Sequence, residues 1–319
     1  MYSRIIGTGS YLPERVLSNF DLEKTVETSD EWIRTRTGIE RRHLAADDET
    51  TSDLAYHAAL AAIKSAGLAP EDIDLIVVGT TTPDLVFPNV ACLLQEKLGV
   101  RGGPAFSVEA ACSGFLYALT TADQYIRGEQ VKRALVVGAE TMSRIVDWTD
   151  RETCVLFGDG AGAVVLEACG QPGIMYTRLG ADGRYRDLLY ASSGVSTRSG
   201  AGEMPALKMK GHEVFKIAVK TLEGIVDDVL ERNRLEKGQI DWLIPHQANI
   251  RIIKATAKRL QMPLERVVLT VQEHGNTSAA SVPLALDTAI RDGRVRRGDL
   301  CLLEAFGGGF TWGAALIRY

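Results

Sequence analysis

The sequence predicts an α/β fold made of two similar halves, residues 1–171 and 172–319. Helical patterns alternate with short apolar runs in both halves, which is typical of α/β proteins whose sheets are buried on both faces. The plan of the first half also recurs in the second. Three positions reappear 167 residues later, since Leu68, Ile73 and Asp74 correspond to Leu235, Ile240 and Asp241. We therefore expect duplicated α/β units.

The first half is predicted to contain two helices and three buried strands. A helical pattern at residues 50–67 precedes an apolar strand at 75–78. A second strand at 104–108 leads into a helix that begins at Ser113, and a charged turn separates that helix from a third strand at 134–137.

The second half repeats this order. We expect a helix at residues 211–233, a strand at 242–244, a further strand at 266–270, and a strand at 300–303. The small-residue stretch at 191–202 is expected to form a surface loop near a site. Sites in such sheets lie at the carboxyl ends of the strands, where the halves meet.

Composition narrows the class of protein. The 319 residues are 45% hydrophobic and carry a net charge of −5. The pI near 5.7 and the lack of a recognised binding motif argue against nucleic acid. Five cysteines without C-x-x-C spacing predict neither disulfides nor a metal site, and their odd number fits a reducing compartment. Without a signal-type or membrane-spanning apolar run, the chain is expected to be cytoplasmic and to avoid membranes.

Cys112 is the strongest candidate for a nucleophile. It stands where the strand at 104–108 passes into the helix beginning at Ser113. Unpaired N–H groups at a helix start favour a thiolate and can hold a developing oxyanion. The ordinary alternative is a buried cysteine that only packs.

Two other polar side chains follow predicted strands in the second half. His246 comes after the strand at 242–244, and Asn276 follows the strand at 266–270. Each has an ordinary explanation, because histidine often caps a strand and asparagine often caps a helix. Together with Cys112, however, they occupy equivalent ends of a duplicated sheet, and a thiolate needs such charge-stabilising neighbours. The glycines in 306–310 allow backbone N–H groups to approach a ligand.

Several motifs resemble β-ketoacyl-acyl-carrier-protein synthase III, and the likeness extends along the whole chain. They are Ala110–Phe115, His246–Asn249, Gly275–Ser281, Phe306–Phe310, Asp30–Ile39 and Phe157–Gly162. The resemblance implies a thiolase-like fold with α-β-α-β-α layers, a homodimer, and a triad of Cys112, His246 and Asn276. It further implies an oxyanion hole formed by the N–H groups of Cys112 and Gly308. The reaction that this resemblance implies needs no metal and no redox cofactor. Acyl-CoA takes part in it as a substrate.

The implied reaction starts fatty-acid synthesis. Cys112 takes an acyl group from a short-chain acyl-CoA, and His246 and Asn276 then stabilise the enolate formed when malonyl-acyl-carrier-protein loses CO2. The product is a 3-oxoacyl-acyl-carrier-protein.

The resemblance also assigns substrate-binding positions. Trp32, Arg36 and Arg151 are similar to residues that stack on and pair with the nucleotide of CoA, and Asn249 to one that orients the His246 region. Phe87 resembles a residue that the neighbouring subunit inserts at the end of the acyl pocket. A large ring there implies a short primer, with acetyl-CoA expected and propionyl-CoA possible.

A basic helix face suggests where the carrier protein docks. Arg251, Lys254 and Lys258 are spaced three and four residues apart, next to an apolar stripe. We include Lys216 in the same docking surface. In an acidic chain, a local basic ridge suits an acidic carrier protein or a phosphorylated pantetheine arm. The alternative is a solvated cationic face.

Three rival functions remain at this point. Starter-unit transfer in polyketide or quinolone assembly would use the same triad on the same fold. A cysteine hydrolase fits the strand–Cys112–helix junction, but the leading glycine of a nucleophile elbow is missing. A non-catalytic acyl-CoA sensor would not need Cys112, His246 and Asn276 together.

Overall fold

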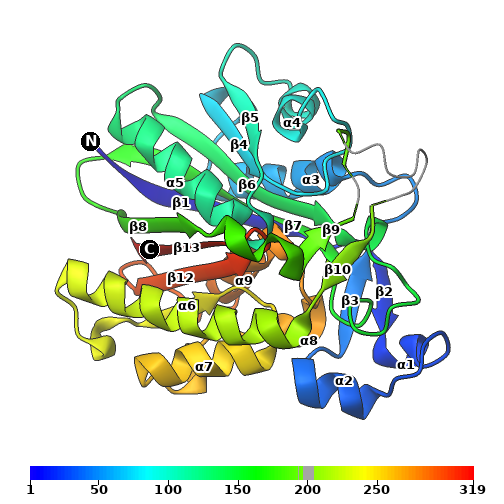
Figure 1. Ribbon diagram of the computed structural model, residues 1–319. Helices are drawn as coiled ribbons and strands as arrows, with labels where there is room; N and C mark the ends of the chain where they lie inside the picture. The colour runs from blue at the N-terminus through cyan, green and yellow to red at the C-terminus, as the bar shows by residue number, and fades with distance from the viewer. Residues whose placement is uncertain (193, 197–204) are drawn as a thin grey trace.

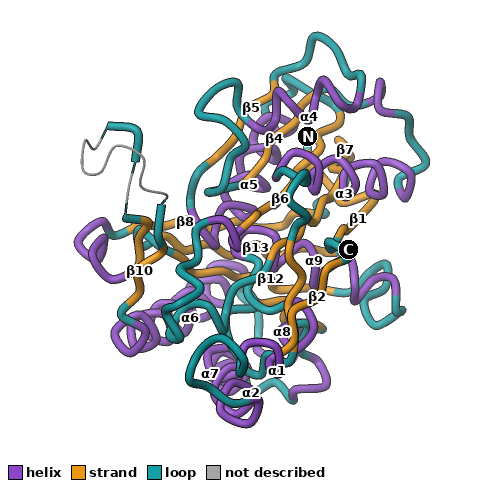
Figure 2. The backbone as a smooth tube through the Cα atoms, turned by 90° about the vertical axis from the view of Figure 1, so that its right-hand side faces the viewer, coloured by secondary structure: helices purple, strands orange, loops and turns teal. Residues whose placement is uncertain are grey.

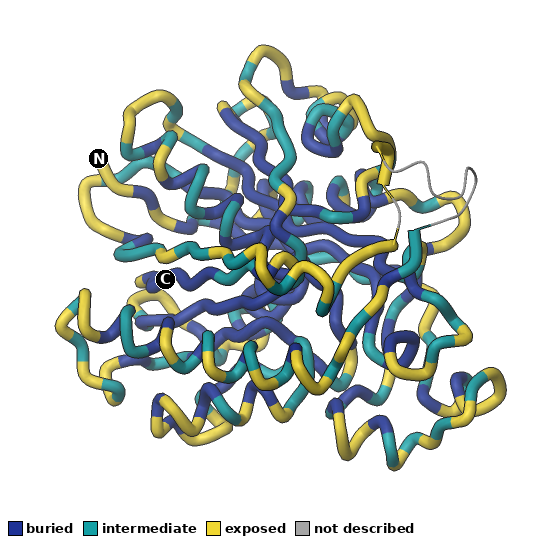
Figure 3. The backbone as a smooth tube through the Cα atoms, viewed as in Figure 1, coloured by how far each residue is buried: buried dark blue, intermediate teal, exposed yellow. Residues whose placement is uncertain are grey.

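A computed structural model describes residues 1–192, 194–196 and 205–319. Most of the predicted loop at 191–202 lies outside the described residues. Figure 1 shows five layers, in which two sheets alternate with three layers of helices. Figure 3 shows that the strands in the middle of the molecule are almost wholly buried, whereas the outer helices expose one side.

The first sheet is built from strands that precede residue 170. Its order is β1 (Tyr2–Tyr11), β7 (Asp159–Cys169), β6 (Arg133–Thr141), β4 (Leu75–Gly79) and β5 (Ala105–Val108). β4 pairs in parallel with both β5 and β6, whereas β7 pairs antiparallel with β6 and β1. Every residue of β4 is buried, which explains why its sequence is apolar without alternation.

Helices α3 (Thr51–Ser65) and α4 (Val90–Leu98) cover the outer face of this sheet. α3 begins with a capping box, in which Thr50 and Asp53 satisfy each other's backbone N–H groups. Its buried side is largely alanine, so the helix lies close to β1.

The middle layer consists of α5 (Gly114–Arg127) from the first half and α9 (Ser281–Arg291) from the second. Apolar side chains of both helices form one core with both sheets. Asp287 of α9 accepts a hydrogen bond from the Thr8 hydroxyl of β1 at 2.7 Å. The middle helices therefore join the two halves.

The second sheet repeats most of the first with later strands. Its order is β11 (Trp242–Pro245), β12 (Leu300–Gly307), β13 (Thr311–Arg318) and β8 (Ile174–Ala181). β11 and β12 are parallel, and the other pairs are antiparallel. This matches the order β4, β6, β7 and β1 in the first sheet. A further strand, β13, follows the glycine-rich turn that comes after the predicted strand at 300–303.

The predicted strand at 266–270 is wrong. The segment forms only a single parallel bridge, between Val267 and Leu243 of β11. The Gln247 side chain replaces the rest of the ladder, since its Oε1 accepts from the N–H groups of Thr270 and Val271. Its Nε2 donates to the carbonyls of Pro245 and Val268. A side chain thus satisfies backbone groups that a strand would have paired.

Helices α6 (Gly211–Asn233) and α7 (Ile250–Leu260) cover the outer face of the second sheet and lie side by side (Figure 2). Smaller elements flank the layers: β2 (Arg15–Ser18), β3 (Arg41–Leu44), β9 (Leu189–Ala191), β10 (Leu207–Met209), α1 (Asn19–Leu22), α2 (Asp30–Thr37) and α8 (Val271–His274). No helix in the described ranges is long and apolar enough to cross a membrane. The predicted layered, duplicated α/β fold is confirmed, and the division at residue 171 stays a prediction.

Candidate active site

Cys112 lies in a 3-10 turn, Ala111–Ser113, between β5 and α5. The preceding Ala111 adopts a left-handed backbone with φ of 44°, which costs free energy for a residue with a Cβ. Gly307 of β12 passes very close, because a Cβ added there would lie 2.6 Å from the Cys112 nitrogen. Cys112 is therefore held between the two halves, and position 307 has no room for a side chain.

His246 directly follows β11, where its backbone N–H donates to the Glu304 carbonyl of β12 at 2.7 Å. Its side chain is 6% exposed, and burial lowers the pKa of the imidazole to about 3. Nδ1 has no hydrogen-bond partner within the described residues. A neutral imidazole at this position is able to donate a hydrogen bond through one ring nitrogen.

Asn276 is fixed by the first half of the chain. Its N–H donates to the Leu156 carbonyl at 2.9 Å, and its carbonyl accepts from the Gly158 N–H at 3.0 Å. The side-chain Oδ1 accepts from the Ser278 N–H at 2.9 Å. The Asn276 amide nitrogen is thereby left for the cavity.

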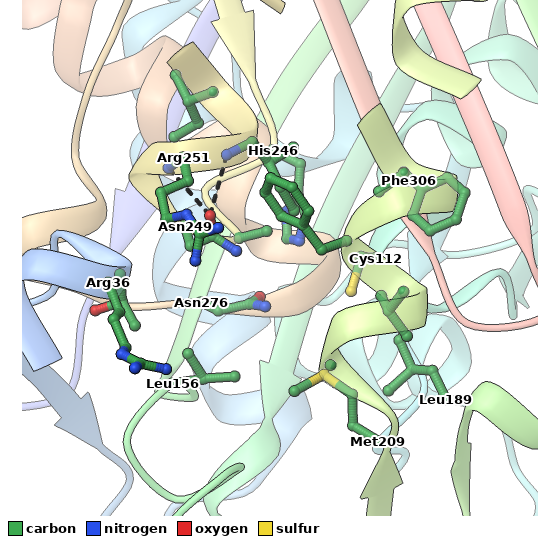
Figure 4. A pocket seen from close by; sticks show the side chains of 18 of the residues that line it. Arg36, Cys112, Leu156, Leu189, Met209, His246, Asn249, Arg251, Asn276 and Phe306 are labelled. Carbon is green, nitrogen blue, oxygen red and sulfur yellow. Dashed lines mark hydrogen bonds between the residues drawn. The ribbon is translucent and has the colours of Figure 1, made fainter. Parts of the chain in front are cut away.

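These three side chains lie around one cavity of about 490 Å³, and Figure 4 shows them facing the same space. Cys112 also lines a second cavity of about 290 Å³, together with Leu189, Ser278 and Gly308. Cys112 therefore borders both cavities, and His246 and Asn276 line only the larger one.

The resting thiol differs from the expectation drawn from the helix start. Burial raises the pKa of Cys112 to about 12, the Ser278 hydroxyl opposes the rise, and the Glu140 carboxylate adds to it. Cys112 is only 7% exposed. The partial positive charge at the helix start therefore does not compensate for the loss of solvation of a thiolate, and the pKa stays high. The thiol of Cys112 and the imidazole of His246 are therefore both neutral at pH 7.

The predicted nucleotide-binding residues come together at the cavity entrance. The guanidinium carbons of Arg36 and Arg151 lie 4.7 Å and 5.0 Å from the Trp32 ring centroid. Asn249 caps α7, because its Oδ1 accepts from the N–H groups of Arg251 and Ile252 (Figure 4). All of these residues line the larger cavity.

The predicted basic ridge is exposed on α6 and α7. Arg251, Lys254, Lys258 and Lys216 are all exposed, and none forms an ion pair within the part of the chain that the structure describes. Arg251 lies 4.8 Å from the Phe215 ring and also lines the cavity. The ridge thus begins at the mouth of the site.

Phe87 does not line either cavity of its own chain. It is 82% exposed, and the adjacent Val86 is 70% exposed. Its predicted place in an acyl pocket therefore requires a second copy of the chain.

The sequence interpretation missed three buried polar residues near the nucleophile, namely Glu140, Ser278 and Glu304. Glu140 and Ser278 are hydrogen-bonded to each other, and Glu304 lines the larger cavity. A charged residue at the end of an apolar strand was the available signal for Glu140 and Glu304, and no sequence signal distinguished Ser278.

Known proteins share this architecture. The family described as 3-oxoacyl-[acyl-carrier-protein] synthase III matches residues 106–183, and its C-terminal counterpart matches 230–319. A β-ketoacyl-[acyl-carrier-protein] synthase III from Xanthomonas campestris pv. campestris is 64% identical, over 100% of this chain and 99% of the relative.

Solved structures of related enzymes have the same fold. The 3-oxoacyl-[acyl-carrier-protein] synthase III from Aquifex aeolicus has a TM-score of 0.94 and 50% identity, covering 99% of this chain and 100% of its own. A priming β-ketosynthase from a polyketide biosynthetic pathway also has a TM-score of 0.94, at 38% identity, with coverage of 99% and 96%.

The chain is therefore highly identical to these synthases along its full length. It also has a cysteine, a histidine and an asparagine that line one cavity. The chain belongs to the β-ketoacyl-acyl-carrier-protein synthase III family of thiolase-like condensing enzymes.

Proposed function

We propose that this chain catalyses the condensation that starts fatty-acid synthesis. A short-chain acyl-CoA acylates Cys112, and malonyl-acyl-carrier-protein then condenses with the bound acyl group to give 3-oxoacyl-acyl-carrier-protein. The observation that carries this proposal is the shared cavity of Cys112, His246 and Asn276, with a second cavity that Cys112 also lines.

In the first half-reaction, the nucleotide of CoA stacks on Trp32 between Arg36 and Arg151, and the pantetheine arm reaches into the cavity. The Cys112 sulfur attacks the thioester carbonyl as its proton passes to the departing CoA sulfur, while the backbone N–H groups of Cys112 and Gly308 hold the oxyanion. The bond from the carbonyl carbon to the CoA sulfur breaks, and CoA leaves as the thiol.

In the second half-reaction, the malonyl group loses CO2 and becomes an enolate. Its oxygen accepts hydrogen bonds from His246 Nε2 and the Asn276 amide nitrogen. A neutral His246 suits this role, because burial lowers its pKa to about 3 and it remains neutral at pH 7. The enolate carbon then attacks the thioester on Cys112, whose sulfur leaves and regains a proton.

The smaller cavity is the proposed acyl pocket. Apolar side chains of Met142, Phe157, Leu189 and Leu207 contribute to its lining. This cavity has a volume of about 290 Å³, and it is the large ring of Phe87 from a second copy, placed at its end, that favours a short primer such as acetyl-CoA. The exposed apolar run Leu85–Phe87 supports a homodimer, since large apolar side chains exposed together often mark an interface.

The basic ridge of Arg251, Lys254, Lys258 and Lys216 is the proposed docking surface for the carrier protein. These exposed cations suit an acidic partner. The cytoplasm is the proposed compartment.

Starter-unit condensation in polyketide assembly is the second candidate, because the priming β-ketosynthase has the same fold at 38% identity. The two functions differ in carrier protein and primer. The hydrolase hypothesis has no support from these relatives, which are named synthases.

The decisive test is intact-protein mass spectrometry after mixing with acetyl-CoA, followed by a chase with malonyl-acyl-carrier-protein. We expect an acetyl adduct that disappears as acetoacetyl-carrier-protein forms, and no adduct on Cys112→Ser. Asn276→Ala should still become acylated but should not condense. An adduct lost to water would contradict the condensing role, and normal condensation by Asn276→Ala would contradict the division of labour.

A further inference from the structure

The Asn276 side chain has to present the correct end to the substrate. An amide has an acceptor oxygen and a donor nitrogen, and only the nitrogen can hydrogen-bond an enolate oxygen. The Ser278 N–H occupies Oδ1 at 2.9 Å, so a rotated amide would lose this bond. The orientation of Asn276 therefore depends on where the Ser278 N–H points.

Ser278 achieves this with an unfavourable backbone. Its φ is 48°, in the left-handed region that favours glycine, where a residue with a Cβ is strained. Such strain persists only when surrounding contacts hold it. Because Ser278 is 1% exposed, those contacts come from protein groups.

The Ser278 hydroxyl supplies one such contact. It donates to Glu140 Oε1 at 3.0 Å, which links the second half of the chain to the end of β6 in the first. Glu140 is fully buried, and its carboxylate is itself held firmly. Thr82 donates to Oε2 from its hydroxyl at 2.5 Å and from its backbone N–H at 3.1 Å, and the Thr81 N–H lies 3.1 Å and 3.2 Å from the two oxygens.

The same hydroxyl lies close to the nucleophile. Ser278 and Cys112 line the smaller cavity together. The link from Glu140 through Ser278 therefore reaches both the acylated residue and the residue that binds the enolate.

We propose that Ser278 is a positioning residue for condensation, anchored by Glu140, whose left-handed backbone aims its N–H at Asn276 and so turns the Asn276 amide nitrogen toward the enolate. This inference rests on the function proposed above. It predicts that the hydroxyl matters for condensation because it holds the backbone.

Two substitutions at one position separate the backbone from the hydroxyl. Ser278→Ala and Ser278→Gly both remove the hydroxyl, so any direct effect on Cys112 is common to both. Only glycine adopts the left-handed conformation without strain. Ser278→Gly is thus the matched control for Ser278→Ala.

The measurement is single-turnover kinetics of each half-reaction, with acylation by acetyl-CoA and condensation of the isolated acyl-enzyme at saturating malonyl-acyl-carrier-protein. We expect equal acylation rates in the two variants. Condensation should fall about 10- to 100-fold in Ser278→Ala, as expected for a weakened oxyanion donor, and should be at least about fivefold faster in Ser278→Gly, since roughly 1 kcal/mol of strain corresponds to that factor.

A double-mutant cycle tests the anchor. Glu140→Gln keeps the shape of the side chain but places an NH2 group among the hydrogen-bond donors of Thr82 and Ser278. Because the Ser278 hydroxyl then loses its acceptor, we expect this variant to slow condensation as Ser278→Ala does. Combined with Ser278→Ala it should add little further loss, because both changes remove the same link. Full additivity would show that Glu140 does not act through Ser278. If Glu140→Gln does not fold, the two Ser278 variants decide alone.

The outcomes distinguish this inference from the proposed function. Failure of the unsubstituted enzyme to condense would refute the function itself. Normal condensation in Ser278→Ala, or equal losses in the alanine and glycine variants, would overturn the positioning role while leaving the function intact.

Discussion

Glu304 provides a quantitative test of how burial acts beside the active site. It lies on β12, is 1% exposed, and neither carboxylate oxygen makes a hydrogen bond of normal geometry within the described structure. Burial raises the pKa of Glu304 to about 8, and the nearby Thr256 hydroxyl opposes this only in part. The folded protein therefore prefers the protonated carboxyl.

The raised pKa makes stability depend on pH. An unfolded glutamate titrates near its ordinary value of 4.5, so the folded state binds an extra proton between about pH 4.5 and 8. The free energy of unfolding should fall as pH rises through this window. At pH 7, which is about 2.5 pH units above the ordinary pKa of 4.5, the lost stability is roughly 3 kcal/mol at 1.36 kcal/mol per pH unit.

Glu304→Gln removes the titration and keeps the shape. We expect the free energy of unfolding of the variant, relative to the unsubstituted protein, to increase by about 3 kcal/mol between pH 4.5 and pH 7. Urea unfolding at a series of pH values measures this difference, and only its pH dependence matters, because the buried amide adds a constant term. Glu265→Gln, at an exposed glutamate, is the control.

A flat difference between Glu304→Gln and the unsubstituted protein across pH 4.5–8 would refute the reasoning. It would mean that the carboxyl is solvated or hydrogen-bonded in solution. A slope of the same size in Glu265→Gln would point to a general charge effect.

Three further predictions concern other parts of the molecule. Gly307→Ala should slow acylation about 100-fold in single-turnover assays, because its Cβ would lie 2.6 Å from the nucleophile's nitrogen, whereas Gly170→Ala, with open space around it, should not. The double variant Lys254→Glu, Lys258→Glu should raise KM for malonyl-acyl-carrier-protein about tenfold and leave KM for acyl-CoA within about twofold. Equal increases in both KM values would refute the docking hypothesis. Burial, reinforced by the charge of His43, lowers the pKa of His274 to about 4, so stability should fall as pH drops from 6.5 to 4, and His274→Gln should flatten that loss in thermal unfolding.

The fold was largely predictable because its signals are local. The buried strand β4 and the helix α6 appear where apolar runs and helical periodicity place them. The segment at 266–270 has the same apolar signal but pairs at one position only. The Gln247 side chain takes over its hydrogen bonds, and a contact across 23 residues leaves no mark in the local pattern.

The sequence predicted that Cys112, His246 and Asn276 lie together, and the structure places them around one cavity; the electrostatics of this candidate site were less predictable. Cys112, His246 and Asn276 follow from the ends of duplicated elements and from a family resemblance. The thiol pKa was not predictable in this way, because it depends on how closely β12 passes the nucleophile and on the charge of Glu140. The link between Ser278 and Glu140 spans 138 positions, and only the folded chain brings them together.

The two buried carboxyl groups near the nucleophile illustrate why burial alone does not define a role. Glu140 accepts hydrogen bonds from Ser278, Thr82 and other groups of the loop after β4, and these bonds oppose the burial that raises the pKa of Glu140 to about 7. Glu304 is equally buried but lines the cavity without hydrogen bonds of normal geometry among the described residues, and burial raises its pKa further, to about 8. The two substitutions therefore call for different measurements. Unfolding of Glu304→Gln at a series of pH values measures stability, whereas the kinetics of Glu140→Gln measure the geometry of condensation. If the two substitutions had the same effects, the distinction drawn from their hydrogen-bond partners would be wrong.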